Sequence, residues 1–224
     1  MRLAVVVGHD PVRRGARGRL PANQHGHEVP GLLEFDANLR LARQMEAVGL
    51  KRGWRVRAFV HAPRTKTGQV IDAADPRPSG PPSYRATVQP TIDEVNAWRP
   101  AAVVELHFNS VPRHNGQGQR MTAGWATSFA YHFPGSPRGE RIGRAASAAS
   151  ARVIGSEDRG SLPRAETWAG APLRVLRGTR APAILLESHN GANYNHHARF
   201  VEALAHGLLA ADLTASIVGA IDWS

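Results

Sequence analysis

Three apolar segments of the sequence each end in a side chain that can bind a metal ion or move a proton. The first ends in Val7-Gly8-His9, the second in Glu105-Leu106-His107 and the third in Leu185-Leu186-Glu187. Ligands of open α/β sheets bind outside the carboxyl ends of the strands, so parallel strands would bring these side chains together at one edge. Two neutral imidazoles and one carboxylate can hold a catalytic zinc ion and leave a coordination position open for water. The pattern therefore favours a catalytic zinc site.

The spacing does not decide which carboxylate completes that site. His9 and His107 supply the imidazoles, and Glu187 is left to handle protons. The candidates for the third ligand are Glu34, Glu28 and Asp10. The chain has no cysteine, which excludes thiol catalysis and thiolate zinc sites, so any metal must be held by His, Asp or Glu.

Other polar residues allow two interpretations each. His189 and Asn190 follow Glu187 closely and either line a substrate groove or form a turn. Asp158-Arg159-Gly160 either contacts a substrate or forms an ion pair within a loop. His25-Gly26-His27-Glu28 lies in a loop rich in Gly and Pro, where histidines are more often solvated than metal-bound. His196-His197 is expected at the exposed start of the last helix.

The elements that must position these residues alternate between strands and helices along the chain. Apolar runs predict strands over residues 3–7, 54–60, 101–107, 125–133 and 183–187. Helical periodicity predicts helices over 34–48, around Pro90 and ending before Pro100, from Ser136-Pro137 to about 153, and a last long helix with Phe200, Leu204 and Leu208 on one face. Residues 10–33, 61–83 and 109–122 are predicted loops. We expect one α/β domain over residues 1–224, with a mostly parallel twisted sheet covered by helices on both faces.

The composition is strongly basic, but the charge alone does not identify a binding partner. Among 224 residues, Lys+Arg number 28 and Asp+Glu 18, which gives a formal net charge of +10. This charge indicates either an anionic partner, such as nucleic acid, membrane or cell-wall polymer, or a well-solvated arginine-rich surface. No apolar run approaches the roughly 20 residues of a membrane helix, so no integral membrane segment is expected. The amino terminus is typical of a first core strand rather than a signal peptide.

Five short motifs in order make the chain similar to a known family. They are Gly8-His9 with Gly15-Ala16-Arg17-Gly18, Glu34 with Asn38-Leu39, Glu105-Leu106-His107-Phe108-Asn109, Asp158-Arg159-Gly160, and the block from Leu176-Arg177 through Pro182 to Glu187. In this order, from residue 3 to about 210, the chain resembles the zinc-dependent N-acetylmuramoyl-L-alanine amidases of the type 3 family. Two positions depart from the family pattern: Asp10-Pro11 follows the first His in place of glycines, and Glu105 replaces a Ser two residues before the second His.

The resemblance implies a ligand set and a function. It implies that His9, Glu34 and His107 bind one zinc ion and that Glu187 is the catalytic carboxylate. Apart from the resemblance, Asn109, His189 and Asn190 are candidates to contact the substrate. That substrate would be bacterial peptidoglycan, cleaved between N-acetylmuramic acid and L-alanine. We expect a single catalytic domain without a separate wall-binding domain. The positive charge would attract it to anionic wall or outer-membrane polymers.

The missing signal peptide and wall-binding repeats suggest a phage or prophage endolysin, made in the cytoplasm and acting at the wall or periplasm after release. A cytoplasmic recycling enzyme is the alternative within this activity. Two other functions compete with the amidase. One is another zinc amidohydrolase or carboxypeptidase on a related scaffold. The other is a basic nucleic-acid-binding protein without catalysis, which ranks last because none of the usual nucleic-acid motifs occurs.

Overall fold

The fold is built on a six-stranded sheet with the strand order β4-β1-β5-β8-β6-β7. The computed structural model describes residues 1–11, 15, 17–20, 29–65, 67–71, 83–110, 127–166 and 173–221. Its strands are β4 (Arg55–Phe59), β1 (Arg2–Val7), β5 (Ala102–Asn109), β8 (Ala183–Asn190), β6 (Thr127–His132) and β7 (Glu157–Pro163). The first four are parallel, β6 runs antiparallel to β8, and β7 is parallel to β6. The carboxyl ends of β1, β5 and β8 therefore meet at one edge.

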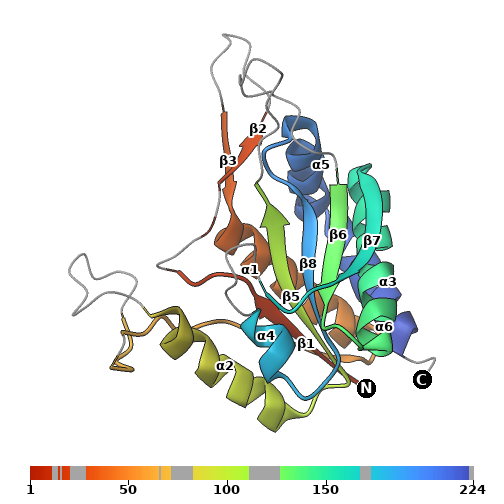
Figure 1. The fold of residues 1–224 in the computed structure, drawn as a ribbon. Coiled ribbons are helices and arrows are strands. Elements are labelled where there is room, and N and C mark those ends of the chain that lie inside the picture. The colour runs from red at the N-terminus through yellow and green to blue at the C-terminus, as the bar shows by residue number, and fades with distance from the viewer. Residues whose placement is uncertain are drawn as a thin grey trace.

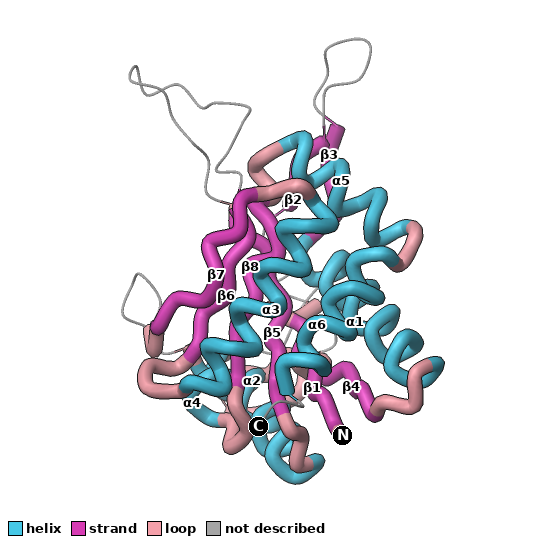
Figure 2. The backbone as a smooth tube through the Cα atoms, turned by 90° about the vertical axis from the view of Figure 1, so that its right-hand side faces the viewer, coloured by secondary structure: helices cyan, strands magenta, loops and turns pink. Residues whose placement is uncertain are grey.

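Helices cover both faces of this sheet, as Figure 1 and Figure 2 show. On one face lie α1 (Glu34–Lys51), α3 (Pro137–Ile154), α5 (Tyr194–Ala205) and α6 (Leu208–Ile221). On the other lie α2 (Tyr84–Trp98) and α4 (Arg174–Gly178). Because β1 and the first residues of β5 and β8 are buried on both faces, residues 3–7, 102–104 and 183–186 are continuous apolar runs rather than alternating ones. This confirms the predicted fold class, a single α/β domain with a mostly parallel sheet.

Local sequence signals explain where the long helices begin and end. The Ser136 hydroxyl accepts a hydrogen bond from the Gly139 amide, and Pro137 occupies the first turn of α3. That helix stops at Gly155, whose φ of 74° suits glycine. Helix α2 begins after Ser83, and it ends at Trp98, before Pro100, where the sequence predicted its end. No single helix in the described ranges has the length and apolar composition to cross a membrane, although α5 and α6, bent by 85°, pass that test as a pair.

Several element predictions were wrong. The segment 10–33 is not all loop, because β2 (Arg17–Leu20) and β3 (Val29–Leu33) pair antiparallel beyond the end to which β5 points (Figure 1). The last helix is two helices, broken where Gly207 adopts a φ of 69°. Leu208 starts the second one and is 57% exposed, so it does not share a buried face with Phe200 and Leu204. The strand β7 and the short helix α4 were not predicted.

Candidate metal centre

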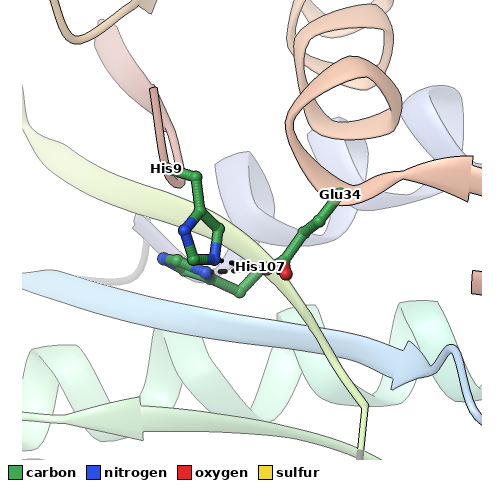
Figure 3. A group of neighbouring side chains, drawn as sticks. All are labelled: His9, Glu34 and His107. Carbon is green, nitrogen blue, oxygen red and sulfur yellow. Dashed lines mark hydrogen bonds and ion pairs between the residues drawn. The ribbon is translucent and has the colours of Figure 1, made fainter. Parts of the chain in front are cut away.

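His9, Glu34 and His107 converge at the carboxyl edge of the sheet (Figure 3). His9 follows β1, His107 lies near the end of β5, and Glu34 is the first residue of α1. One ligand atom from each lies within 4.8 Å of the others. His9 Nε2 is 3.2 Å from Glu34 Oε2, and His107 Nδ1 is 2.9 Å from Glu34 Oε1. The structure thus brings together the three residues that the resemblance implies.

The position of Glu34 depends on how the start of α1 is attached to β5. The Phe108 amide donates a hydrogen bond of 3.1 Å to Glu34 Oε1. One turn later, Asn38 Nδ2 donates 3.0 Å to the Leu106 carbonyl. Residues i and i+4 share a helix face, so both side chains reach the same strand. Of the other carboxylates, Asp10 is buried but is not part of the ligand group, and Glu28 lies outside the described residues.

Two glycines leave room for the ligand side chains. Gly15 has a φ of 73°, and a Cβ there would lie 2.6 Å from Glu34 Oε2 and 2.8 Å from His9 Nε2. A Cβ on Gly8 would lie 2.3 Å from the Leu106 carbonyl and 2.5 Å from His107 Nε2. Any larger residue would displace a ligand or the backbone. The glycines of the first motif therefore have a physical role in forming the centre.

The ion-pair partners set the protonation of the ligands. Burial alone would raise the pKa of Glu34, but the hydrogen bonds and charges of His107 and His9 lower this pKa well below its ordinary value. Burial likewise opposes the charged form of His107, but hydrogen bonds with Glu105 and Glu34 raise the His107 pKa well above its ordinary value. Glu34 is therefore an ionised carboxylate, as a metal ligand must be. His107 must lose a proton to bind a metal.

Glu187 lies beside this centre without joining the ligand group. In the register of β5 and β8 it pairs with His107. Burial raises the Glu187 pKa to about 7. The charges of Glu34 and Glu105 also raise this pKa, whereas the charge of His107 lowers it. Its Oε2 is buried and has no hydrogen-bond partner among the described residues. A half-buried carboxyl with this pKa can take up and release a proton near neutral pH.

The structure separates His189 from the metal centre. His107 pairs with Glu187 but Asn109 pairs with Asn190, so β8 contains one extra residue at this point. Such a bulge shifts the alternation of side chains. The His189 ring is fully buried and stacks on Phe200, with 4.2 Å between the ring centroids. Asn190 Oδ1 accepts the Ala192 amide, which matches the turn interpretation. Substrate contact by Asn109, His189 or Asn190 stays a prediction.

Two further predictions were wrong. His196 and His197 are buried rather than exposed, because α5 packs against β8 and β2. His197 Nδ1 lies 2.9 Å from His189 Nε2. Asp158 lies in the edge strand β7 rather than in a loop, and its carboxylate accepts hydrogen bonds from the Ser147 hydroxyl and the Gly160 amide. Substrate contact by Asp158-Arg159-Gly160 stays a prediction. The segment with His25, His27 and Glu28 lies outside the described residues.

Comparisons with known proteins found similar proteins over nearly the whole length of the chain. The sequence profile of the N-acetylmuramoyl-L-alanine amidase family, type 3, matches residues 3–217. Among solved structures, the catalytic domain of the CD27L endolysin targeting Clostridium difficile is similar with a TM-score of 0.62 and 18% identity, covering 100% of this chain and 98% of that one. The Ami1 amidase of Mycobacterium smegmatis gives 0.63 and 14%, with 100% and 98% coverage. The catalytic domain of the CwlV amidase of Paenibacillus polymyxa gives 0.59 and 17%, with 100% and 97%. No curated protein matches the sequence.

Proposed function

The chain belongs to the N-acetylmuramoyl-L-alanine amidase family, and from this we propose that it cleaves the amide bond between N-acetylmuramic acid and L-alanine of peptidoglycan with one zinc ion held by His9, Glu34 and His107. The observation that carries the metal assignment is the convergence of two imidazoles and one ionised carboxylate within 4.8 Å. Three such ligands are typical of catalytic zinc, because they leave a coordination position for water or substrate.

The donors and their surroundings fit zinc. Nitrogen and oxygen donors suit this metal, and the two glycines leave no room for a larger side chain at the ligands. The Glu34 side chain is 4% exposed, whereas that of His9 is 34% exposed, so the centre is anchored on the protein side and open toward solvent. When bound, zinc would lower the pKa of a coordinated water to about 7 and polarise the amide carbonyl.

Glu187 is the residue that we assign to proton transfer. An amide resists hydrolysis because water is a poor nucleophile and the nitrogen a poor leaving group. Glu187 takes the proton of the attacking water and delivers it to the departing amine. Burial raises the pKa of Glu187 to about 7 in the metal-free protein, which supports a carboxyl that both accepts and releases a proton. Its unpartnered Oε2 supports this role, since no described residue competes for that oxygen.

Digestion of purified sacculi tests the proposed function. We expect new free amino termini of L-alanine and no new reducing sugar ends. Chelation should abolish this release, and added zinc should restore it, because the water needs the metal at neutral pH. New reducing ends would identify a glycosidase instead. Full activity in protein shown to be metal-free would refute the zinc assignment.

We also propose that the enzyme acts as a phage or prophage endolysin at the bacterial wall. The net charge of +10 supports this role, because long-range attraction would concentrate the enzyme near anionic wall or outer-membrane polymers. The experiment compares intact sacculi with soluble muropeptides at increasing ionic strength. A lytic enzyme should degrade sacculi at a rate that falls as salt screens the attraction. A recycling enzyme would act on the soluble fragments and leave sacculi intact.

A further inference from the structure

Glu105 is a carboxylate buried in the apolar middle of β5. Its neighbours across the sheet are Val6 of β1 and Leu185 of β8, and its residue surface is 3% exposed. Burying a charged group is costly unless a partner compensates it. Alternate residues of a strand share a face, so the Glu105 side chain lies on the same face as that of His107. The partner of this buried charge is therefore the ligand histidine.

The two ring nitrogens of His107 contact two different carboxylates. Nδ1 is 2.9 Å from Glu34 Oε1, whereas Nε2 is 3.4 Å from Glu105 Oε1. The Gly8 backbone lies against the Nε2 edge of the ring, because a Cβ on Gly8 would be 2.5 Å from both Nε2 and Cε1. Glu105 is not among the described residues whose ligand atoms converge with those of His9 and Glu34. Glu105 therefore contacts His107 through the ring nitrogen that faces away from Glu34, and it does not line the proposed metal position.

We propose that Glu105 is a positioning residue that accepts a hydrogen bond from the Nε2–H of His107 and thereby holds Nδ1 toward Glu34 and the metal. This inference rests on the proposed function, because it requires His107 to be a zinc ligand. A histidine that binds a metal through one nitrogen commonly donates its other N–H to a carboxylate or carbonyl. That bond fixes the tautomer and the ring orientation and makes the ligand more basic. The serine of the family pattern would supply no negative charge at this position.

Zinc affinity, measured by competition with a chromophoric chelator, tests the role of Glu105. Glu105→Gln keeps the size of the side chain but removes its charge, and we expect zinc binding to weaken about 10- to 100-fold. Glu157→Gln is the matched control, because it removes one carboxylate from the exposed edge strand β7 and should bind zinc as the unaltered protein does. His107→Ala should lose the metal. If Glu105→Gln does not fold, Glu105→Ser replaces it in the same assay.

A second measurement distinguishes positioning from mere structural support. The visible spectrum of the cobalt-substituted protein reports the ligand field directly, and it should change in Glu105→Gln but not in Glu157→Gln. Equal zinc affinity in the two Gln variants, or a lower denaturation midpoint of metal-free Glu105→Gln without a change in affinity or spectrum, would overturn the inference. If the unaltered protein binds no zinc at all, the proposed metal centre itself fails, and the role of Glu105 with it.

Discussion

Burial of His197 predicts that the stability of the fold falls in mildly acidic solution. The ring is fully buried at the start of α5, and burial lowers the pKa of His197 to about 4. In the unfolded chain this pKa is about 6.5. The unfolded state therefore takes up a proton between about pH 6.5 and 4 that the folded state does not, so stability is complete above 6.5 and is lost as the pH falls toward 4. The difference in pKa corresponds to ~3 kcal/mol, at about 1.36 kcal/mol for each unit.

His197→Gln isolates this contribution. Glutamine does not titrate, and its amide can still meet His189 Nε2, which lies 2.9 Å from His197 Nδ1. At pH 7.5 we expect the variant to be about 1–2 kcal/mol less stable, because it loses the ring that stacks on Phe200. Between pH 7 and pH 4 the variant should lose ~3 kcal/mol less than the unaltered protein. Its stability should therefore equal or exceed that of the unaltered protein at the acidic end.

Urea denaturation at several pH values measures this difference, with a chelator present so that zinc release does not contribute. His206→Gln is the control, because His206 is a solvent-exposed residue just after the same helix. Burial and the charges of His197 and His196 also lower the pKa of His189, so His197→Gln removes part of this second shift as well and changes the acid sensitivity in the same direction. A constant difference in unfolding free energy between His197→Gln and the unaltered protein, from pH 7.5 to 4.5, would refute the reasoning.

Three other predictions concern the centre. Glu187→Gln should fold and retain zinc while turnover falls by roughly two to four orders of magnitude. Near-normal turnover would show that another residue is the general base. Loss of zinc would show that Glu187 is a metal ligand. Gly15→Ala should weaken zinc binding, because its Cβ would meet Glu34 and His9, whereas Gly53→Ala shares a positive φ but meets no atom within 4 Å and should not; equal affinities would contradict this account. Glu34→Ala should sharply weaken zinc binding and Glu28→Ala should not, as metal analysis of the purified variants would show.

The apolar runs made most of the central sheet predictable. Residues 3–7 and 183–186 are buried on both faces, so nearly every position in them is apolar and the strands stand out from their surroundings. The edge strand β7 has no such signal, because most of Glu157–Pro163 is exposed or half-buried. The break between α5 and α6 depends on one positive φ at Gly207, within an apolar pattern that continues through it. Periodicity alone does not reveal such a break.

Side-chain direction was harder to predict than proximity. Counting along β8 places His189 on the same face as Glu187, because side chains alternate with a period of two. The single extra residue in β8 opposite His107 and Asn109 cancels that count and moves His189 toward Phe200. The same rule worked on β5, where the register is regular and no bulge lies between Glu105 and His107. The spacing there already implied a shared face, but the contact between the two side chains required the structure.

Sequence spacing could not choose the third metal ligand among Glu34, Glu28 and Asp10, whereas the structure places Glu34 beside both histidines. Glu34 is far from both histidines in the sequence, and its place is determined by a second residue, Asn38. The two side chains, one helical turn apart, bond the Phe108 amide and the Leu106 carbonyl, two positions apart on β5. This double attachment holds the helix start beside His107. The Glu and Asn of one motif therefore act together: Asn38 fixes the helix on the strand, and Glu34 can then reach both imidazoles.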